Sequence, residues 1–130
     1  VIYNSDGTDT ASILDTDSQY DIALLKAKTS NVKPVKIGDS DEVKVGDVVY
    51  VISSPDEKKN VVSKGVVSSF DYFNGMERIF TTAISDNGGS GGAVFLGRTG
   101  ELIGIVDGGN DTTKRCIITP IDGIRQVLAN

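Results

Sequence analysis

The most constraining feature of this sequence is the recurrence of short runs rich in Val, Ile and Thr, separated by Gly, Asp, Asn and Ser. Such runs are typical of β-strands, and the polar residues between them are typical of turns. We expect strands at residues 1–4, 10–14, 22–27, 48–53, 60–70, 79–82, 93–95, 102–106 and 115–120. Strands this short and evenly spaced, without helices between them, predict an all-β barrel or sandwich rather than an α/β fold.

One segment near the C-terminus has a different period. Its apolar residues recur at positions i, i+3, i+6 and i+7, which share one face of a helix: Ile121, Ile124, Val127 and Leu128. This pattern predicts a short amphipathic helix. Pro120 suits the entrance to this helix. We expect the helix to pack against the last barrel.

Composition excludes several classes of function. The 130 residues suffice for one domain with a core. A net charge of −5 argues against binding to nucleic acid, and no apolar run reaches the ~20 residues of a membrane helix. With one Cys and no His, the chain can form no internal disulfide, and a zinc site of the usual kind is effectively excluded.

The strongest chemical signal is Gly88-Gly89-Ser90-Gly91-Gly92. On composition alone, four glycines in five residues are equally consistent with a flexible loop. A nucleophilic Ser, however, needs a tightly turned backbone whose N–H groups point at the oxyanion that it creates, and glycines on both sides permit such a turn.

The sequence around this motif resembles the nucleophile region of trypsin-like serine proteases, usually written G-[DN]-S-G-G-P and followed by a hairpin and G-I. The Gly-x-Ser-Gly-Gly core is intact, and Gly104-Ile105 follows the hairpin. Gly89 and Ala93 depart from the usual Asp or Asn and the usual Pro. The resemblance implies that Ser90 is the nucleophile and that the N–H groups of Gly88, Gly89 and Ser90 form the oxyanion hole.

A second segment, Asp21-Ile22-Ala23-Leu24-Leu25-Lys26, begins with an Asp that by itself need only start a buried strand. It resembles the D-[IL]-A-[LV]-L-K segment that carries the triad Asp in the same superfamily, and its place before Ser90 agrees with the chain order His, Asp, Ser. Segments 35–52, 61–69 and 116–121 then narrow the resemblance to the bacterial HtrA-like proteases. For that family we expect a trypsin-like double six-stranded β-barrel with a short C-terminal helix.

The first barrel is expected to be incomplete. Residues 1–37 contain only about three of the expected strands, which cannot close a barrel, and the chain starts inside a strand. We expect residues 1–37 to be the remainder of the first barrel, with Asp21, and residues 38–130 to be the second barrel with the helix. The catalytic His, which the family carries upstream of the Asp, lies outside this chain, so the segment alone should be inactive or nearly so.

The resemblance also implies a set of residues around the first specificity pocket: Ile84, Ser85, Asp107, Gly108, Gly109 and Cys116. Ile84 and Cys116 are equally well explained by core packing. If they line the pocket, it is apolar and partly filled, which favours small aliphatic residues at the cleaved position. No metal or organic cofactor is implied, because triad chemistry needs only protein groups.

The expected partners are a polypeptide substrate and the missing N-terminal part of the protease domain, in the same chain or a separate one. The resemblance favours an extracytoplasmic or secreted location. HtrA-like proteases often carry a PDZ domain and often form trimers, so a homo-oligomer is left open. Two alternatives to an endopeptidase are also open: a catalytically inactive, protease-like domain that binds peptides or serves as a scaffold, and an unrelated β-rich binding module.

Overall fold

The computed structural model describes residues 2–4, 7–28, 32–54, 61–73, 75–84, 90–109 and 115–128. Its largest unit is a closed barrel of six antiparallel strands in the order β10-β7-β6-β5-β8-β9. The barrel strands are β5 (Val48–Ser53), β6 (Val61–Phe73), β7 (Met76–Ile84), β8 (Ala93–Leu96), β9 (Leu102–Gly109) and β10 (Arg115–Pro120). All nine expected strand segments fall within or overlap strands of the structure, and the barrel expected after residue 38 is present.

The barrel is filled by side chains that alternate along its strands between the interior and the outer surface. In β5, Val49, Val51 and Ser53 are buried and their neighbours are more exposed, as expected for strands with one face toward a core. Val94, Ile103 and other buried residues complete an apolar cluster inside the barrel.

A short 3-10 turn, Ser40–Glu42, precedes the barrel. Asp39 caps this turn by accepting a hydrogen bond from the Asp41 N–H at 2.9 Å.

The N-terminal part forms two separate two-stranded sheets, β1 (Ile2–Asn4) with β2 (Gly7–Asp9) and β3 (Ala11–Asp17) with β4 (Ile22–Ala27). This is one strand more than expected, because β2 was not predicted. Neither sheet closes on itself, which agrees with the expectation of an incomplete first barrel. Ile13, Leu14 and Leu25 are 68%, 57% and 48% exposed, so the β3–β4 pair leaves large apolar side chains uncovered.

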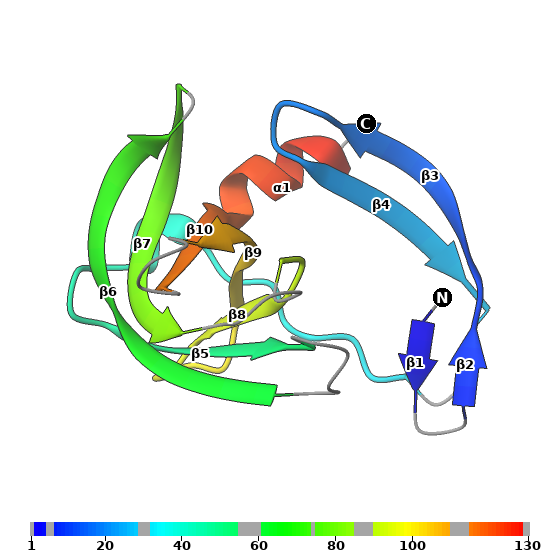
Figure 1. Cartoon of the computed structure of the whole chain (residues 1–130), viewed down its shortest axis with the longest axis horizontal. Helices are drawn as coiled ribbons and strands as arrows, with labels where there is room; N and C mark the ends of the chain where they lie inside the picture. The colour runs from blue at the N-terminus through cyan, green and yellow to red at the C-terminus, as the bar shows by residue number, and fades with distance from the viewer. Residues whose placement is uncertain are drawn as a thin grey trace.

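The C-terminal helix, α1 (Ile121–Leu128), starts directly after β10, as the periodicity predicts. It contacts β9 and β10 of the barrel and also β3 and β4, and so lies between the two parts of the molecule (Figure 1). Gly123 permits this close packing, because a Cβ at that position would overlap the ring of Tyr20. No helix in the described part of the chain is both long and apolar enough to span a membrane.

Candidate active site

Ser90 lies at the start of a turn whose backbone is fixed by the neighbouring strand β9. The Gly91 N–H donates to the Val106 carbonyl at 2.7 Å, and the Val106 N–H donates to the Gly92 carbonyl at 2.8 Å. Gly91 has φ of 90°, a left-handed conformation that glycine adopts without strain. Ser90 itself is exposed. The turn therefore presents a hydroxyl to solvent on a backbone that two hydrogen bonds tie to the barrel.

Asp21 ends the turn between β3 and β4. Its φ of 55° makes it the only residue other than glycine with positive φ in the described part of the chain, and Asp is among the few residue types that tolerate this region. One residue earlier, the Tyr20 N–H donates to the Asp17 carboxylate at 3.0 Å, which holds the turn. Asp21 is exposed.

Asp21 and the Ser90 turn open onto the same cavity. This cavity, of about 380 Å³, is lined by Asp21 and Gly91 together with apolar residues of three elements: Ile22, Ala23, Leu24 and Leu25 of β4, Ile105 of β9 and Ile124 of α1. It lies where the two-stranded β3–β4 sheet meets the barrel. Asp21 and the turn that carries the exposed Ser90 are 69 positions apart in the sequence, and both border this one space.

A model of the trypsin-like peptidase domain matches residues 1–105 of this chain. The chain belongs to the trypsin-like peptidase family. Its curated relatives include an HtrA-like serine protease of Staphylococcus haemolyticus, which is 38% identical over a 121-residue alignment that covers 82% of this chain and 19% of the relative. The periplasmic pH-dependent serine endoprotease DegQ of Escherichia coli is 34% identical over a 100-residue alignment that covers 73% of this chain and 22% of DegQ.

Solved structures agree with this assignment. An HtrA-type protease, AlgW with tripeptide, superposes with a TM-score of 0.86 and 27% identity, over 96% of this chain and 44% of that one. AlgW with decapeptide gives 0.83 and 25%, over 97% and 43%. The chain is therefore an HtrA-like member of the trypsin-like peptidase family. It spans about a fifth of the length of the curated relatives that it matches.

Within this trypsin-like frame, the residues predicted for the specificity pocket have different surroundings. Ile84, at the end of β7, is 55% exposed, whereas Cys116 on β10 is 1% exposed and belongs to the barrel core. Burial raises the pKa of the Cys116 thiol to about 11. Gly108 faces open space, since a Cβ there would meet no atom within 4 Å. Gly109 is the last residue of β9. The assignment of these residues to the pocket stays a prediction.

Three predicted site residues, Ser85, Gly88 and Gly89, lie outside the described residues. Asp107 has a partner that the sequence did not indicate: its carboxylate forms an ion pair with the buried Arg78 at 3.2 Å. No local sequence motif predicts that Arg78 contacts Asp107, because the two residues lie on β7 and β9, which are separated by β10.

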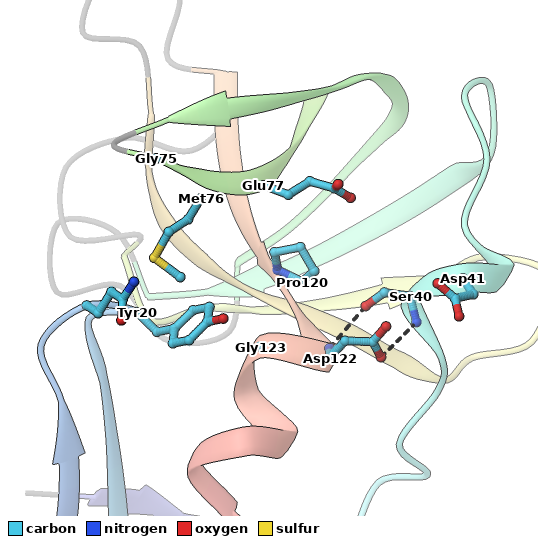
Figure 2. Close-up of a pocket in the computed structure, with 10 residues that line it drawn as sticks. Tyr20, Ser40, Asp41, Gly75, Met76, Glu77, Pro120, Asp122 and Gly123 are labelled. Carbon is cyan, nitrogen blue, oxygen red and sulfur yellow. Dashed lines mark hydrogen bonds between the residues drawn. The ribbon is translucent and has the colours of Figure 1, made fainter.

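A second cavity of about 380 Å³ lies beside Tyr20 (Figure 2). Figure 2 shows Met76 over the Tyr20 ring and Ser40 hydrogen-bonded to Asp122. Three carboxylates near this cavity, those of Asp39, Asp41 and Asp122, have oxygens within 4.8 Å of one another. Asp39 caps the 3-10 turn, and Asp122 exchanges hydrogen bonds with Ser40 at 3.5 and 3.2 Å. These backbone contacts account for where Asp39 and Asp122 lie.

Proposed function

We propose that this chain supplies the nucleophile and the orienting carboxylate of an HtrA-type serine endopeptidase. Ser90 is the nucleophile, Asp21 orients the base, and the base is a His outside this chain. The observation that carries the proposal is the cavity shared by Asp21 and the Ser90 turn. In a triad the imidazole must reach the hydroxyl with one nitrogen and the carboxylate with the other, so it must occupy a space that both groups border.

The proposed reaction follows from the roles of these groups. The His removes the Ser90 proton as the hydroxyl attacks the scissile carbonyl, and it returns that proton to the leaving amine. Asp21 holds the imidazole in the required tautomer and stabilises the imidazolium that forms. The N–H groups of Gly88, Gly89 and Ser90 stabilise the oxyanion. The rigid attachment of the Ser90 turn to Val106 supports this role, because preorganised donors and nucleophiles need no reorganisation during the reaction.

We further propose that additional strands of the first barrel cover the β3–β4 sheet and bring the His with them. Two observations support this proposal: the exposure of Ile13, Leu14 and Leu25 on that sheet, and the largely apolar walls of the cavity beside Asp21. Apolar surface of this kind normally marks an interface. Residues 1–37 then belong to the first barrel, and residues 38–130 form the second barrel with its helix.

The test is complementation with the upstream segment. The chain is joined to that segment, or mixed with it as a second polypeptide, and treated with an organophosphonate active-site probe. We expect strong labelling at Ser90 in the completed domain and little in the isolated chain, because an unactivated Ser is a poor nucleophile at neutral pH. Ser90→Ala serves as the negative control. Strong labelling of the isolated chain at Ser90 would show that the missing base is not needed.

The alternative is a catalytically inactive relative that binds peptides or serves as a scaffold. The departures at Gly89 and Ala93 favour it weakly. A residue other than His at the upstream position, or a completed domain that binds peptide but never labels at Ser90, would establish this alternative and exclude the endopeptidase.

A further inference from the structure

An ion pair between a buried arginine and a partly buried aspartate joins two strands of the barrel, next to the residue that holds the Ser90 turn. The Arg78 side chain on β7 is 3% exposed, and its Nε donates to the Asp107 carboxylate on β9 at 3.2 Å. Its Nη1 donates to the Glu77 carbonyl at 3.2 Å. Strand β10 lies between β7 and β9, so the pair spans three strands. A guanidinium is planar and rigid, which makes it well suited to hold a carboxylate in one place.

Asp107 occupies an irregular position in β9. On β10, the adjacent residues Ile117 and Ile118 face Gly108 and Val106, so that Asp107 has no residue opposite it. An extra residue of this kind is a β-bulge, which bends the strand and re-aims the residues that follow. Within the part of β9 that pairs with β10, from Gly104 to Gly109, Arg78 therefore holds the one residue that has no partner.

The residues on the two sides of this bulge belong to different parts of the candidate site. Val106, directly before it, forms both backbone hydrogen bonds to the Ser90 turn, with Gly91 and Gly92. Gly108 and Gly109, directly after it, belong to the predicted substrate pocket, and Gly108 faces open space. We expect this end of β9 to be the strand with which the substrate backbone pairs. The geometry of the bulge consequently sets the offset between the nucleophile and the predicted substrate strand.

We propose that Arg78 is a positioning residue for peptide substrates, which acts by holding the Asp107 bulge between the Ser90 turn and Gly108–Gly109. This inference rests on the proposed endopeptidase function. An extended substrate that adds to an exposed strand gains its affinity from main-chain hydrogen bonds along that strand. A shift of the strand relative to Ser90 thus penalises a longer peptide, which uses several of these bonds, more than a single-residue substrate.

The experiment compares substrates of two lengths in the full-length protein, including the upstream segment. An N-acetylated single-residue ester and a tetrapeptide ester with the same cleaved residue are hydrolysed by the wild type, Arg78→Ala and Arg78→Lys. We expect Arg78→Ala to lower the ratio of kcat/KM for the long ester over the short one by roughly tenfold or more, since small misplacements have large effects on reactive geometry. Arg78→Lys should restore part of this ratio, because it retains the charge.

A matched control is Arg98→Ala. It removes a different ion pair of the same barrel, with Asp47 at 3.4 Å, from a side chain that is 51% exposed, and should leave the ratio unchanged. Because Arg78→Ala leaves Asp107 without its counter-charge, the double variant Arg78→Met/Asp107→Leu is measured as well: it removes both charges together and should show the same loss of ratio. Faster amide hydrogen exchange at Gly108 and Gly109 in these variants is the second expected result.

Two outcomes would overturn the inference. Equal loss on both esters would show that Arg78 has only a general structural role, and an unchanged ratio with unchanged amide exchange would show that the bulge does not depend on the pair. A wild-type protein that neither hydrolyses the esters nor labels with the organophosphonate probe would instead contradict the proposed function, and this inference with it.

Discussion

Replacing Gly65 by Ala should destabilise the barrel far more than the size of one methyl group suggests. Gly65 lies on β6 opposite Val49 of β5, and its missing side chain would point at Ala83 of β7. A Cβ at this position would lie 2.7 Å from the Ala83 Cα and 2.9 Å from its Cβ, and closer still to its backbone nitrogen. Ala83 is fully buried, and two of the three atoms are backbone.

The magnitude follows from what can move. A flexible side-chain end could swing aside, but here β6 or β7 must shift within a closed barrel. Overpacking of this kind costs about 1–3 kcal/mol, from which the reduced entropy of the unfolded chain recovers about 0.4–1 kcal/mol. We expect a net loss of about 1–2 kcal/mol in the free energy of unfolding, and a decrease in Tm of roughly 3–8 °C.

The assay is equilibrium urea unfolding followed by far-UV circular dichroism, with thermal unfolding as a second measurement. Gly108→Ala is the matched control, because it makes the same change in a strand of the same barrel where no atom lies within 4 Å of the new Cβ. Its free energy of unfolding should stay within about 0.5 kcal/mol of wild type. Equal stabilities of the two variants would refute the argument that β6 and β7 approach too closely for a side chain at residue 65.

Three further predictions concern chemistry. In the completed domain, Asp21→Asn should lower kcat by about 10⁴-fold, as expected for loss of the correct His tautomer, and kinetics of peptide hydrolysis measure this; a loss below tenfold would contradict the triad assignment. Cys116 should react with iodoacetamide at pH 8 on the order of a hundredfold more slowly in the folded than in the unfolded chain, since burial raises its pKa to about 11 from 9.0. The protonated, buried thiol makes its full contribution to the free energy of unfolding below pH 9, and this contribution is lost as pH rises toward 11. A peptide-library cleavage profile should show small aliphatic residues such as Val, Ala or Ile at the cleaved position. Ile84 and Cys116 would make the pocket apolar, so that a Lys or Arg side chain there would bury an unpaired charge. A dominant preference for Lys or Arg would show that the pocket assignment is wrong.

Much of the local structure could be predicted from the sequence because its causes are local. The alternation in Val48–Ser53 and the period of the segment beginning at Ile121 depend on neighbours within a few residues, and both elements are present. The predictions failed where pairing with a neighbouring strand extends a strand beyond its apolar run. Residues 76–78 were left outside the strand expected at 79–82, yet they belong to β7, because they pair with residues 71–73 at the end of β6.

The sequence also identified the family and named Asp21 and Ser90 as candidates, since their motifs are short and contiguous. The convergence of Asp21 and the Ser90 turn on one cavity is different, because it depends on how the β3–β4 sheet and α1 pack against the barrel. The need for glycine at residue 65 likewise comes from Ala83, and the partner of Asp107 is Arg78 on a strand that is not its neighbour. Such contacts form only when the barrel has closed and the strand registers are set, so a local sequence pattern cannot predict them.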